Sequence, residues 1–174
     1  MYLLERADIE RLLRLLAIRL SDNGIRGTIS LVGGAAISLE YLIERDATTD
    51  IDAILPQHPL VSSIIQDIAE EEALSPDWVN SAVTAYVPFE TSQMWKEIMT
   101  VGSITIRIAT AELLLAMKLK ADRGLRDRSD IEGLIKLMKI RSVSEIDEIY
   151  EKYHHQEVLS DRTKSVVREM LSHL

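Results

Sequence analysis

Cysteine is absent from this 174-residue sequence. Without it the chain has no disulfide bonds, no thiolate zinc site and no cysteine nucleophile. Long hydrophobic runs are also absent, since no stretch approaches the roughly 18 apolar residues of a membrane-spanning helix. The first leucine-rich segment carries Glu5, Asp8 and Glu10, whereas a secretory signal peptide has a positively charged start. We therefore expect a cytoplasmic protein that does not enter a membrane.

Basic residues are fewer than acidic residues. Lysine and arginine number 20 against 28 aspartates and glutamates, so the net charge is −8. A chain this acidic is not expected to bind nucleic acid over its whole surface, although a local basic patch or a metal-bridged phosphate still allows a contact. The sequence has no Walker A motif, no dinucleotide fingerprint and no serine–histidine–aspartate order around a nucleophile elbow. Adjacent His154 and His155 point in different directions on a helix and make a poor metal pair.

Apolar residues make up 47% of the chain and charged residues 28%, the balance of an ordinary globular domain. Hydrophobic periodicity predicts helices over residues 7–22, 35–43, 60–74, 110–121, 127–138, 144–153 and 160–174, a helical turn over 77–82, and strands over 28–32, 50–55, 97–101 and 104–108. We expect an α/β (α+β) fold in which a small mixed sheet is flanked by helices and the C-terminal part is all helical. Residues 1–138 would form the core, and residues 139–174 a helical extension packed on it or used for a homodimer.

One stretch carries chemical information. The strand over 28–32 runs into Gly33-Gly34, where a helix starts. Glycine lets the backbone approach a ligand closely, and the N–H groups of a helix start bind phosphate. The next predicted strand carries Asp50 and Asp52, which point to the same face because they lie two residues apart. Two such carboxylates can hold one hard cation, and Mg²⁺ is the usual one beside a nucleotide phosphate.

Each half of this pattern has an ordinary structural reading. A Gly-Gly pair after a strand is common in turns, and an Asp-X-Asp pair is usually two solvated charges at a strand end. The combination is more specific, because the alternate residues Ile51 and Ala53 face the core and a plain edge strand has no reason to carry two acids on one face. A phosphate cradle beside a carboxylate pair is what metal-assisted nucleotidyl transfer requires.

At these residues the sequence resembles the nucleotidyltransferase superfamily, the polymerase-β-like fold, whose hallmark is Gly-Gly or Gly-Ser at a helix start followed by Asp-X-Asp on the next strand. It is most similar to the small bacterial branch of type IV abortive-infection toxin nucleotidyltransferases and their relatives. The resemblance includes the link Arg45–Asp52 and the segment Asp77–Asn80. It also includes the helix and following helix start over 111–134, with matches at Lys118, Arg123, Arg126, Asp127 and Asp130.

The resemblance implies a role for each matched residue. Gly33 and Gly34 would contact a nucleoside triphosphate, and Asp50 and Asp52 would bind Mg²⁺ (or Mn²⁺). Lys118 would reach a phosphate, and Arg123 would assist nucleotide binding. Asp127 would act with the catalytic residues, supported by Asp130. These two aspartates, three residues apart at a helix start, could position Lys118 or Arg123, or face the metal site.

Other readings of these residues stay open. Lys118 lies on a mostly apolar helix and could extend its ammonium to water. Asp127 could be an N-terminal charge that the helix dipole favours, a role compatible with a catalytic one. Arg123 and Arg126 fit surface or salt-bridge positions better than ligand positions.

The sequence departs from the superfamily pattern in one respect. Many members place a third acid on a later strand, but the strand over 104–108 offers Thr105 and Arg107 at its alternating positions. Glu97, at the start of the partner strand, could substitute for the acid or be an exposed edge residue. Arg107, if it points into the site, would favour phosphate binding over metal binding.

Two functions follow as hypotheses. The first is a Mg²⁺-dependent transfer of a nucleotidyl group to a hydroxyl of RNA or protein, in a toxin–antitoxin or phage-defence setting with a cognate protein partner. The second is a binding module of the same fold with little or no catalysis, such as a partner-binding or antitoxin-like subunit, which the absent third acid favours. An enzyme should bring Asp50, Asp52 and a third carboxylate around one cleft.

Overall fold

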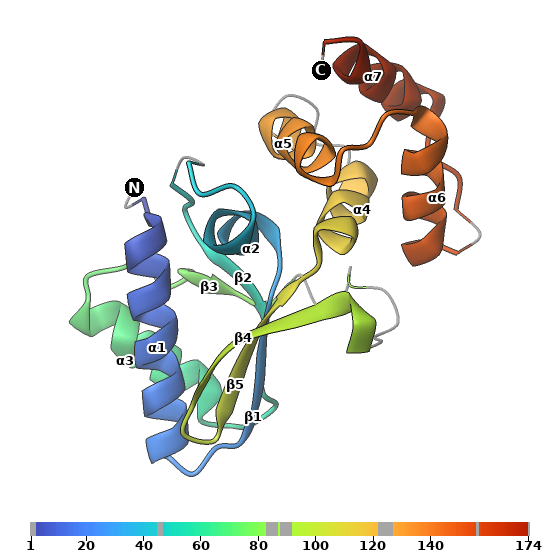
Figure 1. Cartoon of the computed structure of the whole chain (residues 1–174). Helices are drawn as coiled ribbons and strands as arrows, with labels where there is room; N and C mark the ends of the chain where they lie inside the picture. Colours follow the sequence, from blue (N-terminus) through green and yellow to red (C-terminus); the bar gives the residue numbers. More distant parts are fainter. Residues whose placement is uncertain are drawn as a thin grey trace.

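The computed structural model describes residues 3–44, 47–82, 87, 92–121, 127–155 and 157–173. Helices and strands alternate in the first two thirds and helices alone form the last third (Figure 1). The elements run in the order α1 (Arg6–Asp22), β1 (Gly27–Leu31), α2 (Gly33–Glu40), β2 (Ile51–Ile54), α3 (Val61–Glu71), β3 (Val79–Asn80), a 3-10 turn (Ser92–Met94), β4 (Trp95–Val101), β5 (Ile104–Ala109), α4 (Ala111–Ala121), α5 (Arg128–Met138), α6 (Val143–Tyr153) and α7 (Asp161–Ser172). This architecture confirms the predicted fold class.

The five strands form one mixed sheet in the order β3-β2-β1-β5-β4. β1 runs parallel to β5 and antiparallel to β2, while β2 pairs in parallel with β3. β4 and β5, which correspond to the strands predicted over 97–101 and 104–108, form an antiparallel hairpin, and Gly102 in its turn has a φ of +58°, which glycine adopts without strain.

The segment over 77–82 corrects one prediction, since its central residues form β3 rather than a helical turn. Trp78 anchors this short strand. Its indole Nε1–H donates to the carbonyl of Ile65 at 3.1 Å, and its own carbonyl accepts from the N–H of Ile51 at 2.8 Å. The buried ring and these two bonds hold the backbone extended beside β2, which local propensity did not indicate.

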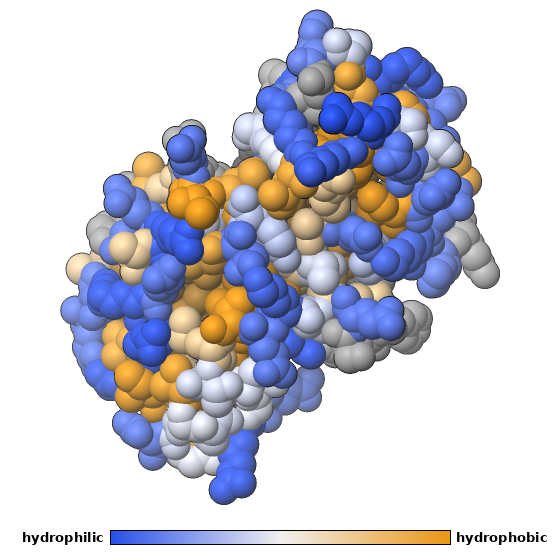
Figure 2. Space-filling view, in the orientation of Figure 1, coloured by the Kyte–Doolittle hydropathy of each residue, from blue (hydrophilic) through white to orange (hydrophobic). Residues whose placement is uncertain are grey.

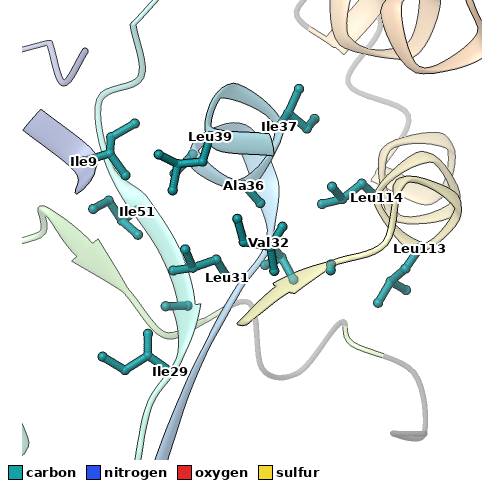
Figure 3. Packing of buried hydrophobic residues seen from close by; sticks show 14 of the residues in the cluster. Ile9, Ile29, Leu31, Val32, Ala36, Ile37, Leu39, Ile51, Leu113 and Leu114 are labelled. Atoms are coloured by element: carbon teal, nitrogen blue, oxygen red, sulfur yellow. The ribbon is translucent and has the colours of Figure 1, made fainter. Parts of the chain in front are cut away.

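The two faces of the sheet differ in polarity. One face carries apolar side chains that are fully buried; it includes Ile29, Leu31, Ile51, Ala53, Ile106 and Ile108. α1 and α3 pack beside each other against this face, and Ile9 of α1 lies close to Ile51 (Figures 1 and 3). Because strand residues alternate, the opposite face carries Ser30 and Arg107, which are paired across β1 and β5. The polar face is therefore the one available for chemistry.

α2 packs against β2 of the sheet and against α4 of the helical part. It begins at Gly33 and ends at Glu40, two residues earlier at its start and three earlier at its end than the predicted 35–43. It stops there because the N–H of Leu42 turns back to the carbonyl of Ile37. The hydroxyl of Tyr41 donates to the carbonyl of Ala109 at 2.9 Å, and burial raises the pKa of this hydroxyl to about 12.

The C-terminal helices lie together beyond the end of β5 (Figure 1). Thr110 caps α4, since its Oγ1 accepts from the N–H of Leu113 at 3.4 Å. α5 and α6 both contact α4, and α7 packs on α6. Val167 and Met170 of α7 are buried, whereas Val166 is 38% exposed. Polar side chains cover much of the visible surface of this part (Figure 2). Within the described residues, no helix has the length and hydropathy to cross a membrane.

Candidate active site

The start of α2 and the strand β2 meet at Gly33 and Asp52. Gly33 has a φ of +65°, in the left-handed region, and directly follows β1. A β-carbon at residue 33 would lie 3.2 Å from Asp52 Cγ and would overlap Oδ2 of the same carboxylate. The N–H of Val32 donates to the carbonyl of Asp52 at 3.0 Å and fixes this register. The first glycine of the motif is therefore required both by its backbone conformation and by the aspartate beside it.

Asp50 precedes β2 and lies on the same side of the chain as Asp52. Both aspartates are half-buried, whereas Ile51 and Ala53 between and after them are fully buried. The hydroxyl of Thr49 donates to Asp50 Oδ1 at 3.1 Å, and the hydroxyl of Thr48 donates to the Asp50 carbonyl at 3.2 Å. The residue order predicted this shared face, and the alternation in burial agrees with it.

These residues fit a divalent metal ion. Carboxylate oxygens are the ligands that Mg²⁺ and Mn²⁺ prefer, and Mg²⁺ is usually held by one or two carboxylates together with substrate phosphates. The described part of the chain contains no group of three or more histidine, aspartate or glutamate side chains arranged to hold a metal. Asp50 and Asp52 would thus supply the protein ligands, and the remaining positions would fall to ligand phosphates and water.

Gly34 is the second residue of α2 and is half-buried, like Gly33. The first N–H groups of a helix have no partner within that helix, and the helix dipole gives this end a partial positive charge. The Asp52 carboxylate lies beside this end. The arrangement therefore places a helix start suited to phosphate next to a carboxylate suited to metal.

Lys118 lies in a separate cluster that joins α4 to α5. Its Nζ is 2.5 Å from Asp127 Oδ1 and 2.9 Å from Asp130 Oδ2. The three side chains, which we call the Lys118 cluster, are 14%, 5% and 3% exposed, respectively. The sequence led us to expect that the two aspartates could position Lys118, and the geometry agrees with that arrangement. The reading in which Lys118 extends into water is wrong.

Asp127 does not act as a side-chain cap. It occupies the N-cap position of α5, but its carboxylate makes no capping hydrogen bond and turns instead to Lys118. Burying carboxylates is costly unless they are paired, and the ammonium of Lys118 pairs with both of them. Arg123 and Arg126, the other basic residues of this motif, lie outside the described residues.

Arg107 lies on the polar face of the sheet. Its Nε–H donates to Ser30 Oγ at 2.7 Å, and its guanidinium carbon lies 4.5 Å from the centre of the Trp95 ring. This distance is within the range of a cation–π contact. Burial lowers the pKa of Arg107 from its ordinary value. Ser30 and Trp95 thus help to hold this side chain in the strand position where the sequence lacks a third acid.

Glu97 is paired with Arg107 across β4 and β5, and its side chain is exposed. Three strand spacings separate β4 from β2, about 14 Å across the sheet, so Glu97 lies far from Asp52. The residue paired with Asp52 on its other side is Asn80 of β3, an amide rather than an acid. Within the described residues, the sheet thus brings no third carboxylate beside Asp52.

Sequence reasoning gave no site role to Ser30 or Asn80, and it missed the contact of Trp95 with Arg107. Ser30 could have been found, because a polar residue inside a buried strand signals a hydrogen-bonding role, and it is 1% exposed. The role of Asn80 was hidden by the wrong helical interpretation of its segment. Nothing in the sequence around Trp95 indicates the contact with Arg107.

Comparison with models of known protein families gives one match. The model of a family described as "Nucleotidyltransferase of unknown function (DUF6036)" matches residues 9–170, which covers the sheet, the Gly33–Asp52 contact and the Lys118 cluster. Among curated proteins, none matches the chain in sequence. The match agrees with the resemblance drawn from the Gly-Gly and Asp-X-Asp motifs. The chain therefore belongs to this family of nucleotidyltransferases of unknown function.

Proposed function

We propose that the protein binds a nucleoside triphosphate with Mg²⁺ (or Mn²⁺) and transfers its nucleotidyl group to a hydroxyl of RNA or protein. The observation that carries this proposal is the contact between Gly33 and Asp52, because it sets a metal-binding carboxylate directly against a helix start. Membership of a nucleotidyltransferase family supports the same reaction class.

In this mechanism, the N–H groups at Gly33 and Gly34 bind phosphate oxygens and hold the triphosphate at the start of α2. Asp50 and Asp52 hold the divalent cation, which when bound neutralises part of the triphosphate charge. The acceptor hydroxyl oxygen forms a bond to the α-phosphorus, the bond from that phosphorus to the bridging oxygen breaks, pyrophosphate leaves, and the hydroxyl proton passes to solvent. The protein contributes mainly orientation and charge.

The acceptor and the biological setting are further parts of the proposal. The net charge of −8 favours an acceptor that the protein binds through a small contact area over one that it binds along its whole length. By resemblance to the abortive-infection branch, we place the reaction in a toxin–antitoxin or phage-defence system with a cognate protein partner.

Calorimetric titration tests the nucleotide site. Each nucleoside triphosphate, with Mg²⁺, is titrated into the wild type and into the double variant Asp50→Asn, Asp52→Asn. A second double variant, Asp22→Asn, Asp67→Asn, makes the same charge change on exposed positions of α1 and α3. Metal-dependent binding that only the first variant loses supports the proposal. If the wild type binds no nucleotide up to about millimolar concentration (a binding free energy weaker than about −4 kcal/mol), the proposal fails.

A second candidate function has its own observation. The side chain at the expected place of the third acid is Arg107, a fixed cation, and such a site can bind a nucleotide without turning it over. The protein would then be a nucleotide-sensing or partner-binding module. Incubation with triphosphate labelled at the α-phosphate separates the two functions: label that becomes covalently attached to RNA or protein favours the enzyme. Binding without transfer, with total cell RNA and protein supplied as acceptors, favours the module.

A further inference from the structure

Three neighbouring strands bring Ser30, Asp52 and Arg107 to one face of the sheet. Ser30 of β1 is paired with Arg107 of β5 on one side and with Ile54 of β2 on the other. Asp52 lies two residues from Ile54 and so points to the same face. Two strand spacings, about 10 Å across the sheet, separate the backbones of Arg107 and Asp52. The long arginine side chain therefore starts within reach of a ligand bound at Asp52.

Contacts with Ser30 and Trp95 hold the side chain of Arg107 in its conformation. Ser30 is 1% exposed, and its hydroxyl accepts the Nε–H of the guanidinium at 2.7 Å. Trp95 covers the guanidinium at 4.5 Å. The bond to Ser30 and the contact with the Trp95 ring fix the orientation of the guanidinium and therefore of its terminal nitrogens. These nitrogens carry the four N–H groups with which arginine binds phosphate oxygens.

Trp95 is placed for this contact at a cost. Its indole Nε1 is buried and has no hydrogen-bond partner within the part of the chain that the structure describes. An unpartnered buried donor disfavours folding. Trp78, by contrast, donates its indole N–H to a carbonyl. A ring held over a cation without satisfying its own N–H is the kind of exception that marks a functional site.

From this geometry we infer that Arg107 binds the phosphate chain of the nucleotide from the β5 side, in place of a third carboxylate and of any second metal ion that such a carboxylate would hold. The inference rests on the proposed function and deepens it. A guanidinium at this position repels a second divalent cation and attracts phosphate oxygens directly. The site thus uses one carboxylate pair with one metal ion on the β2 side and a fixed protein cation on the β5 side.

Because Arg107 would bind phosphate without a metal ion, part of the affinity for the phosphate chain should not depend on Mg²⁺. Inorganic tripolyphosphate is the probe, because it carries the phosphate chain without base or sugar. It is titrated with EDTA and with Mg²⁺ into the wild type, Arg107→Gln and Arg107→Lys. Arg26→Gln removes one charge from an exposed arginine just before β1, at the end of that strand opposite Gly33, and serves as the matched control.

The wild type and Arg26→Gln should bind tripolyphosphate in EDTA, and Arg107→Gln should bind it about 10- to 100-fold more weakly, as expected for the loss of a charge-assisted contact. Arg107→Lys should keep part of the affinity, since it retains the charge but not the paired N–H geometry. Tryptophan fluorescence gives a second readout, because the ligand should alter the emission of Trp95 in the wild type and not in Arg107→Gln. Circular dichroism checks that each variant is folded.

The possible outcomes distinguish a failure of this inference from a failure of the proposed function. If Arg107→Gln and Arg107→Lys bind as tightly as the wild type while Asp50→Asn, Asp52→Asn abolishes Mg²⁺-dependent nucleotide binding, the inference is overturned and the proposed function stands. If the wild type shows no binding of tripolyphosphate in EDTA, the inference is also overturned. If the wild type binds no nucleoside triphosphate with Mg²⁺, both fail together.

Discussion

The carboxylate of Asp52 occupies the space into which a β-carbon of Gly33 would project. This relationship links the two halves of the motif, because the glycine is needed where it stands for the aspartate to lie against the helix start. The left-handed φ of +65° adds a second requirement for glycine at the same residue. Structure and chemistry therefore constrain residue 33 together.

Gly33→Ala should lower the free energy of unfolding by more than the usual cost of a left-handed alanine, which is about 1–2 kcal/mol. Gly24 offers the matched control: its φ is +74°, and a β-carbon there would meet nothing within 4 Å. Urea unfolding of Gly24→Ala and Gly33→Ala should thus differ by the overlap with Asp52 alone. The double variant Gly33→Ala, Asp52→Ala should recover about 1 kcal/mol relative to the sum of the single changes. Additive effects would contradict the contact.

The Lys118 cluster predicts a large loss of stability on removal of its cation. Lys118→Met takes the ammonium away from the two buried carboxylates of Asp127 and Asp130, and breaking a buried ion pair in this way costs about 3–5 kcal/mol. Thermal and urea unfolding would measure the loss. The triple variant Lys118→Met, Asp127→Asn, Asp130→Asn also removes the two carboxylate charges and should regain part of it. Lys120→Met, on a cation 36% exposed and paired with Glu157, should change stability by less than about 1 kcal/mol.

Much of this fold could be predicted from local pattern. The period of the apolar residues located most helices to within a few residues. β3 could not be found in this way, because two residues become a strand only through Trp78 and the register with β2. Long-range pairing, rather than the residues themselves, decides such a segment.

The same distinction between local pattern and long-range pairing applies to the candidate site. The Gly-Gly and Asp-X-Asp residues lie close in sequence, so their meeting follows from a strand, a helix and a strand in order. The partners of Lys118 lie nine and twelve residues further along the chain, and their pairing with it was anticipated as one of several arrangements. The stacking of Arg107 on Trp95 needs the pairing of β4 with β5 and the bond to Ser30 across β1, which no single segment carries.

His154 predicts a dependence of stability on pH. Its Nε2 lies 3.2 Å from the carbonyl of Ala116, an acceptor, so the neutral ring carries its proton on Nε2. The side chain is buried next to Tyr150, and burial lowers the pKa of His154 below its ordinary 6.5. The unfolded chain then binds a proton more readily than the folded one below pH 6.5. Stability should fall as the pH drops from 6.5 towards the folded pKa, by up to about 1.4 kcal/mol per pH unit.

Urea unfolding at pH 7.5, 6.5 and 5.5 measures this effect in His154→Gln, His155→Gln and the wild type. His155 is the neighbouring histidine and is exposed. His154→Gln should show a shallower loss of stability on acidification, while His155→Gln should follow the wild type. An equal slope in His154→Gln and the wild type would remove His154 as the cause.

Lys139 ends α5 in a left-handed conformation, with a φ of +57°, and its N–H donates to the carbonyls of Ile135 and Lys136. Glycine is the residue that takes this position most readily, because it has no β-carbon to meet the following carbonyl. Lys139→Gly should therefore raise the free energy of unfolding by about 0.5–1 kcal/mol, after allowance for the greater freedom of glycine in the unfolded chain. Lys136→Gly, on an exposed position inside the same helix, should lower it by about 1 kcal/mol. Opposite signs for two lysine-to-glycine changes three residues apart would establish that the sign follows backbone conformation, whereas losses in both would show that residue 139 is held by its side chain instead.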